Sequence, residues 1–268
     1  MAKTHLIFDR LAYRRHRDRA SVYLHQTDHL LKEAADRMLE RLLEDPQVKL
    51  GSVLEIGSRS GYIEKALRQE RPVGTYLASD LSLAMLRKNP SASVVFDEEL
   101  VPFSGPQFDT IISLLNMHFV NDIPGALAQL RRTLKPGGLF ICSMLGGDTL
   151  RELRHAIIET EASLSPIIYP RVSPYTEVKD AGSLLQRTGY ALPVTDTDTV
   201  TVLYKNPLSL MKDLQRMGES NALLERNKHF TSRHTLQSIA ETYTRLYANS
   251  EGEIPATFEI ITLTGWNP

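Results

Sequence analysis

The sequence predicts a doubly wound α/β fold built on a seven-stranded, mainly parallel sheet. Short apolar runs alternate with amphipathic stretches at the spacing of βαβ units, and a glycine-containing turn links the first such run to a helical stretch. The 268 residues are 42% hydrophobic. That is enough for one sizeable core, and single cores stop growing near roughly 250–300 residues. One domain with additions is therefore expected.

The expected elements follow in chain order. Apolar residues at helical spacing predict a helix over 22–43, which Pro46 ends. Short apolar runs predict strands over 52–56, 75–79, 93–96, 108–115 and 139–145. The stretches between them predict helices over 62–68, 83–88 and 124–134.

The C-terminal half continues with a helix over 177–188, for which Gly189 is a suitable C-cap. Residues rich in Thr and Val predict a strand over 195–204, and a last strand is expected over 257–264. Helical stretches over 207–217 and 232–248 lie between these two strands. They predict an inserted cap, because a hairpin needs only a short turn.

The composition excludes several classes of protein. The 31 Lys and Arg against 32 Asp and Glu argue against a protein built mainly to bind nucleic acid. No apolar run is long enough to span a membrane, so no stable membrane insertion is expected, and no secretory signal is visible at Met1. Cys142 is the single cysteine, which fits a reducing compartment. We expect a cytoplasmic location, including the inner face of the membrane.

The turn in the run VLEIGSRSGY has the features of a ligand-binding loop. Gly57 lets the backbone pass close to a ligand, and Gly61 lets the following helix start near the sheet. The N–H groups of the loop, including that of Ser58, and of the helix N-terminus suit the carboxylate of an amino-acid-like ligand. Glu55 is placed to hold a ligand ammonium. Dinucleotide-binding and purely structural loops share this pattern, so it is weak alone.

Acidic residues after the next two strands strengthen this interpretation. Asp80, at the end of the second strand, is placed to accept hydrogen bonds from both hydroxyls of a ribose, with Leu81 beside it. Asp97 follows the third strand, where it and Glu98 are placed to accept from an adenine amino group. A solvated acidic turn is the alternative for 97–99.

These segments resemble the motifs of the class I methyltransferases that depend on S-adenosyl-L-methionine (SAM). LEIGSRSGY is similar to their first motif, SDLSLAML to the second, FDEELVPF to the third, and LRRTLKPGGLF to the helix, turn and strand after the fourth. The resemblance covers roughly 8–145 and implies SAM as cofactor. Such loops usually read Gly-x-Gly-x-Gly, but Arg59 stands at the middle glycine. Its side chain would narrow the pocket or meet a carboxylate.

The flanking segments resemble a narrower family. FDR, GGDTLRELR, SPYTEVKDAGSLLQRTGY, VTDTD, DLQRMGESN and PATFEIITLTGW are similar to the methyltransferase-like proteins of mitochondrial complex I assembly, which are linked to hydroxylation of an arginine in a complex I subunit. The resemblance implies a protein substrate. The malonyl-acyl-carrier-protein carboxyl methyltransferases, which also carry an insert before the last strand, are more distantly similar.

The catalytic candidates follow strands or lie in these segments. Asn116 and His118 follow the fourth strand, where a His would act as a base or pack against the cofactor. Asp148 either lines the substrate side or caps a helix that starts at Thr149. Glu219 is either a substrate contact or part of a polar turn.

Two further features have alternative interpretations. His25 and His29 share a helix face, but no third ligand is evident, so no metal site is expected. The basic stretch over 14–19 predicts a solvated lid helix near the cofactor, or a contact with RNA, lipid or an acidic protein.

The sequence predicts four parts of the chain: a helical lid over 1–50, a SAM-binding core over 51–205, a helical insert over 206–256 and the last strand over 257–268. The leading function is modification of a protein arginine in complex I assembly. A methyltransferase for a small or carrier-bound acceptor and a non-catalytic assembly chaperone are the alternatives. For an arginine substrate, Asp148, Asp213 and Glu219 are expected to form a carboxylate surface.

Overall fold

A seven-stranded mixed sheet organises the chain in the computed structural model, which describes residues 6–24, 26, 28–164 and 168–268; His25 lies outside these residues. The strand order is β3-β2-β1-β4-β5-β7-β6, and β7 runs antiparallel to both β5 and β6, whereas the other neighbouring strands are parallel. The strands are β1 (Ser52–Ile56), β2 (Thr75–Asp80), β3 (Ser93–Val95), β4 (Phe108–Leu114), β5 (Leu134–Leu145), β6 (Ala191–Tyr204) and β7 (Ile254–Trp266). The predicted doubly wound sheet is confirmed.

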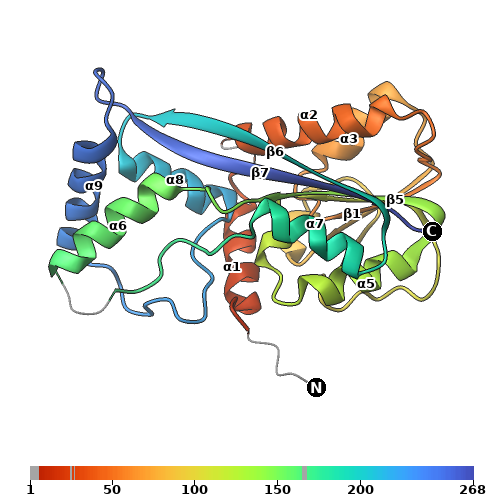
Figure 1. The fold of residues 1–268 in the computed structure, drawn as a ribbon, viewed down its shortest axis with the longest axis horizontal. Coiled ribbons are helices and arrows are strands. Elements are labelled where there is room, and N and C mark those ends of the chain that lie inside the picture. The colour runs from red at the N-terminus through yellow and green to blue at the C-terminus, as the bar shows by residue number, and fades with distance from the viewer. Residues whose placement is uncertain (1–5, 25, 27, 165–167) are drawn as a thin grey trace.

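Helices cover both faces of this sheet (Figure 1). One face packs against α2 (His29–Glu44) and α3 (Tyr62–Glu70), and the other against α5 (Ile123–Thr133) and α7 (Val178–Arg187). The central strands are buried on both sides, which explains why their sequences read as continuous apolar runs. The chain order reverses between β1 and β4, and ligands of open α/β sheets bind at such a point, beyond the carboxyl ends of the strands.

A cap stands beyond that edge of the sheet. It contains α6 (Arg151–Leu164), α8 (Pro207–Met217) and α9 (Arg233–Tyr247), with α6 packed on α9 (Figure 1). The sequence predicted α8 and α9 there but not the length of α6. The strands β6 and β7 run into the cap, and β7 already begins at Ile254 because its ladder with β6 continues to the Tyr204 pair.

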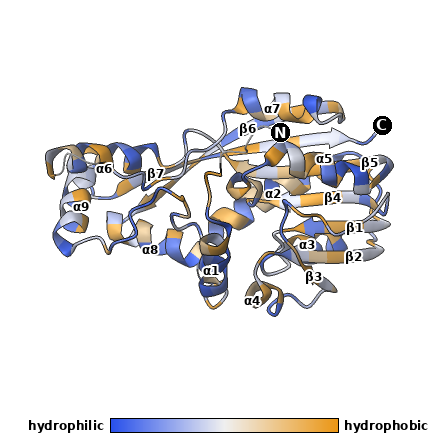
Figure 2. Ribbon diagram, turned by 90° about the horizontal axis from the view of Figure 1, so that it is seen from below, coloured by the Kyte–Doolittle hydropathy of each residue, from blue (hydrophilic) through white to orange (hydrophobic). Residues whose placement is uncertain are grey.

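The N-terminal region contains two helices, as the helix expected over 22–43 and the basic lid helix expected over 14–19 indicated, but the first of these expected helices is shorter. α2 starts at His29, after the N-cap position of Asp28, and buries its apolar face on the sheet. α1 (Arg10–Ala20) lies between the cap and the side of the core that carries α4 (Leu83–Leu86) (Figure 2).

No helix among the described residues is long and apolar enough to cross a membrane.

Candidate functional site

The loop after β1 has the backbone shape of a close-approach turn. Gly57 and Gly61 have φ values of +69° and +76°, which favour glycine. A side chain on Gly57 is excluded, because its Cβ would lie 2.6 Å from the side chain of Asn116. The Ser58 N–H donates to the Ser79 carbonyl at 2.9 Å, which fixes the loop to the end of β2.

Glu55 is held within the fold. The hydroxyl of Tyr76 on β2 donates to Glu55 Oε2 at 2.8 Å, and the carboxyl group is buried. Burial raises the pKa of Glu55 to about 8, although the hydrogen bond from Tyr76 opposes the rise. Near neutral pH much of this carboxyl is therefore protonated, which weakens it as a partner for a ligand ammonium.

The predicted ribose carboxylate is paired with an arginine of α1. Arg17 forms an ion pair with Asp80, and its Nε lies 3.3 Å from Asp80 Oδ1. Both side chains are buried, with 0% and 1% of their surface exposed. The N–H of Ser82 also donates to Asp80 Oδ1 at 2.9 Å, so both carboxylate oxygens have partners.

The predicted adenine carboxylates are paired with another arginine of the same helix. Arg10 Nη2 lies 2.8 Å from Asp97 Oδ1 and also forms an ion pair with Glu98. The Phe119 carbonyl accepts from the same guanidinium at 3.0 Å. Leu81 is buried in a small cluster on this side of the site.

Tyr13 lies between these two arginines on α1. Its ring stacks on Phe119 with a centroid separation of 4.2 Å, and its hydroxyl donates to Asn116 Oδ1 at 3.0 Å. Asn116 in turn donates to Glu98 Oε1 at 2.6 Å. The carboxylates are of the kind that adenosine requires, but side chains of α1 hold them. In this conformation the residues do not fit SAM.

Arg59 crosses from the loop to the cap. This residue has a φ of +48°, and its guanidinium donates to the carbonyls of Met217 and Leu115 at 2.7 and 3.1 Å. It also donates to Glu219 Oε1 at 2.8 Å. The departure from the glycine pattern therefore links the cofactor loop to the turn after α8.

His118 holds the other oxygen of Glu219. Its Nε2 lies 3.1 Å from Glu219 Oε2, and its Nδ1 lies 3.4 Å from the N–H of Leu145. The Nε2–H group therefore donates to Glu219. Burial would raise the pKa of Glu219, but His118 and Arg59 together lower it to about 2. The side chain is therefore a carboxylate at any ordinary pH.

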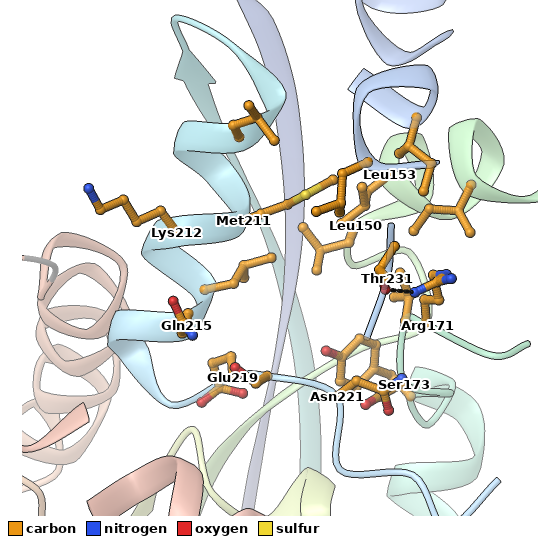
Figure 3. Close-up of a pocket in the computed structure, with 18 residues that line it drawn as sticks. Leu150, Leu153, Arg171, Ser173, Met211, Lys212, Gln215, Glu219, Asn221 and Thr231 are labelled. Carbon is orange, nitrogen blue, oxygen red and sulfur yellow. Dashed lines mark hydrogen bonds between the residues drawn. The ribbon is translucent and has the colours of Figure 1, made fainter. Parts of the chain in front are cut away.

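A cavity of about 550 Å³ lies within the cap, among α6, α8, α9 and the segments that connect them. Its walls are mainly apolar side chains of the cap, among them Leu153 and Met211. Figure 3 shows Glu219, Ser173 and Asn221 gathered at one end of the cavity, below the apolar side chains.

The expected carboxylate surface does not assemble around Glu219. Asp148 has 66% of its side chain exposed and lies 3.6 Å from Arg151, and it does not line the cavity. Asp213 lies 4.0 Å from Arg216 and is also outside the lining. Of these three carboxylates, Glu219 is the one that lines the cavity.

The sequence predicted a solvated lid helix near the cofactor over 14–19, but not that side chains of α1 pair with the carboxylates of the site. Arg10, Tyr13 and Arg17 are spaced at i, i+3 and i+7, so they share one face of a helix. That spacing was a usable signal, because two arginines on one helix face are suited to carboxylate partners on a neighbouring surface. The partners of those arginines, 63 to 88 positions away, could not be found locally.

Comparison with known proteins identifies the family. Residues 23–243 match the model of a methyltransferase domain. The chain belongs to the methyltransferase-domain family. It is 38% identical to a protein from Danio rerio named "Arginine-hydroxylase NDUFAF5, mitochondrial", over 98% of this chain and 83% of that protein. Its SAM-dependent enzyme type and predicted fold are thereby confirmed.

Other members of the family are also similar. A malonyl-[acyl-carrier protein] O-methyltransferase from Xylella fastidiosa is 30% identical over 94% of this chain and 83% of that protein. The solved structure of a methyltransferase from Bacillus halodurans superposes with a TM-score of 0.61 and 14% identity, covering 88% of this chain and 99% of the other. The latter likeness concerns the fold alone.

Proposed function

We propose that this methyltransferase-family enzyme binds SAM and modifies an arginine side chain of a protein subunit during assembly of respiratory complex I. The relatives at 38% identity, which carry the name arginine-hydroxylase, support an arginine as acceptor and hydroxylation as the reaction. The site residues proposed for the cofactor are Glu55, Gly57, Ser58, Gly61, Asp80, Leu81, Asp97 and Glu98.

The anionic side chain of Glu219 at the end of the cavity carries this proposal. A carboxylate offers about four lone-pair positions, and Arg59 and His118 use one each. The remaining positions suit a guanidinium, which pairs with carboxylate through two parallel hydrogen bonds. The apolar walls of the cavity suit the aliphatic stem of an arginine.

His118 has a positioning role in this proposal. Both of its ring nitrogens have partners, because Nε2 meets Glu219 and Nδ1 meets the Leu145 N–H. A ring with both nitrogens engaged is a poor proton acceptor. It therefore orients the carboxylate toward the cavity, while Asn116 and Asp148 stay candidates for contacts with the cofactor and the substrate surface.

Mass spectrometry of complex I subunits from a deletion strain tests the proposal. Hydroxylation is a two-electron oxidation, so reconstitution needs molecular oxygen and a reductant in addition to SAM. A subunit arginine that gains the mass of one oxygen atom only when the enzyme is present supports hydroxylation. A gain of one methylene group indicates methylation, and an unmodified subunit contradicts both.

Peptide binding tests the role of Glu219 separately. A peptide containing the subunit arginine should bind more tightly than its Arg→Lys version, because a lysine ammonium cannot form the two parallel hydrogen bonds of a guanidinium. Glu219→Gln should weaken the arginine peptide by about 1.5–3 kcal/mol, the range for a hydrogen bond to a charged group. Asp213→Asn, whose side chain lies outside the cavity, serves as the matched control. Equal binding of both peptides would exclude the assignment.

A carboxyl methyltransferase for a carrier-bound acceptor is the second candidate. The apolar walls of the cavity suit an acyl chain. The relative at 30% identity named malonyl-[acyl-carrier protein] O-methyltransferase has that chemistry. Release of a methyl ester from a malonyl carrier protein in the presence of SAM would favour this function.

The proposed substrate determines the cellular location that we propose for this protein. We propose the cytoplasm, at the inner face of the membrane that holds the assembling complex, as the location of this chain. The names of the relatives at 38% identity contain the word mitochondrial. A fluorescent fusion followed through cell fractionation, in strains with and without complex I, would test this location.

A further inference from the structure

We propose that α1 is an intramolecular occupant of the adenosine site and that SAM must displace it in order to bind. This inference rests on the cofactor assignment of the proposed function. It concerns the order of events at that site and holds for either candidate acceptor.

One helix holds carboxylates that come from separate loops. Arg17 pairs with Asp80 after β2, and Arg10 pairs with Asp97 and Glu98 after β3. These are the groups that the ribose hydroxyls and the adenine amino group would need as acceptors. Asp80 Oδ1 accepts from Arg17 and from the Ser82 N–H, and Oδ2 accepts from Arg17 and from the Arg59 N–H, so all of its lone-pair positions are in use. α1 and adenosine therefore compete for this carboxylate.

Tyr13 fills the space between these ion pairs. Its ring is fully buried, stacks on Phe119, and lies within 5.4 and 5.8 Å of the guanidinium carbons of Arg10 and Arg17. The hydroxyl binds Asn116, which closes the space in front of Gly57. A flat ring with polar partners at its edge thus stands where a nucleoside base would stack.

One buried hydrogen-bond donor of α1 is left unsatisfied where this helix packs against the core. Nη1 of Arg17 is buried and has no hydrogen-bond partner among the described residues. A buried donor without a partner destabilises the closed arrangement, which favours exchange with a ligand. The apparent affinity for SAM is then the intrinsic affinity multiplied by the fraction of molecules in which α1 is released.

Release of α1 would also affect the cavity proposed for the acceptor, because α1 contacts a segment that lines it. Its N-cap residue Asp9 forms an ion pair with Arg226 at 2.8 Å, and the Asp9 N–H donates to the Ala222 carbonyl at 2.8 Å. His16 Nδ1 lies 3.2 Å from the Ser220 carbonyl. These contacts fix the segment that carries Glu219. SAM binding and acceptor binding are therefore coupled through α1, and the coupling is reciprocal.

Calorimetry with SAM tests the competition. The double variant Arg10→Met/Arg17→Met keeps the bulk of both side chains but removes their ion pairs, so we expect SAM to bind at least about tenfold more tightly than to the unaltered protein. Arg14→Met, which changes an exposed arginine of the same helix, should leave the affinity unchanged. Weaker binding by the double variant would overturn the inference, because the arginines would then support the cofactor.

Hydrogen exchange in the unaltered protein tests the displacement without any substitution. On addition of SAM, amides of residues 10–20 should exchange faster, while those of the loop 57–61 become protected. Slower exchange in α1 would show that it closes over SAM, and would overturn the inference while leaving the proposed function intact. If SAM binds neither the unaltered protein nor the double variant, both the inference and the cofactor assignment fail.

Discussion

The guanidinium of Arg59 and the carboxylate of Glu219 lie 2.8 Å apart, although 160 positions separate them in the sequence. This ion pair joins the loop after β1 to the turn after α8, so it connects the cofactor side of the molecule with the cavity. Both side chains are nearly buried, with 5% and 7% of their surface exposed.

Arg59→Gly should therefore destabilise the protein, even though glycine is the usual residue of such loops. Loss of one partner of a buried pair costs about 3–5 kcal/mol, and relief of the left-handed backbone returns about 1 kcal/mol. We expect the free energy of unfolding to fall by about 2–4 kcal/mol in urea denaturation. Arg59→Lys retains the charge, so its free energy of unfolding should lie between that of the unaltered protein and that of Arg59→Gly. A glycine variant as stable as the unaltered protein would show that the pair is energetically neutral.

Glu55 should make stability fall as the pH rises. Its pKa is raised from 4.5 to about 8 by burial, so the folded state holds a proton that the unfolded chain has lost between these values. The free energy of unfolding should then decrease by about 1.4 kcal/mol per pH unit over this window from this group alone.

Glu55→Gln keeps an acceptor for the Tyr76 hydroxyl and cannot ionise. Its stability should therefore lack the decline between pH 5 and pH 8 that Glu55 causes. Urea titrations at several pH values measure both proteins. Parallel profiles would mean that Glu55 ionises at its ordinary pKa in the fold.

A double-mutant cycle on Arg17 and Asp80 should give strong coupling in the absence of SAM. Asp80→Ala leaves a fully buried guanidinium without its partner, at a cost of about 3–5 kcal/mol. Adding Arg17→Met removes that isolated charge, so the double variant should be less destabilised than the sum of the single changes, by about 1–3 kcal/mol. Additive effects would indicate that the two side chains do not interact in solution.

Chelation should leave the melting temperature unchanged. Among the residues that the structure describes, no cluster of three or more His, Cys, Asp or Glu side chains is placed to hold a metal ion. Thermal unfolding with and without EDTA measures this. A lower melting temperature that zinc or iron restores would reveal a structural metal.

The parts of the fold that local signals determine could be predicted from the sequence. α8 begins and ends at the predicted residues, because Asn206 caps its start through the Ser209 N–H and Gly218 ends it with a φ of +85°. β1 is equally well bounded by its apolar run and the following glycine. In contrast, β5 begins at Leu134 although its strand was expected only from residue 139, because its pairing with β4 continues through a shift of register.

The candidate site was predictable by position but not by pairing. The order of the strands brings Asp80 and Asn116 to one edge, as the motifs indicated, and Glu219 joins them from the turn after α8 through Arg59 and His118. The ion pairs were not predictable, because the partners of Arg17 and Arg59 lie on elements that are distant in the sequence. Such pairing depends on packing that no local pattern encodes. The same holds for the isolation of Asp148 and Asp213 from Glu219.

The ribbon formed by β6 and β7 has a consequence for how this enzyme can be divided. Its ladder runs from the Ala191–Trp266 pair at the core to the Tyr204–Ile254 pair at the cap, and it is continuous from Val194 onward after a shift of register near Ala191 (Figure 1). The cap has no linker of its own at this junction, so a cut between the two parts would sever paired backbone. The cap should therefore melt together with the core in one cooperative transition. A chimera that exchanges caps between relatives would have to carry both strands with it.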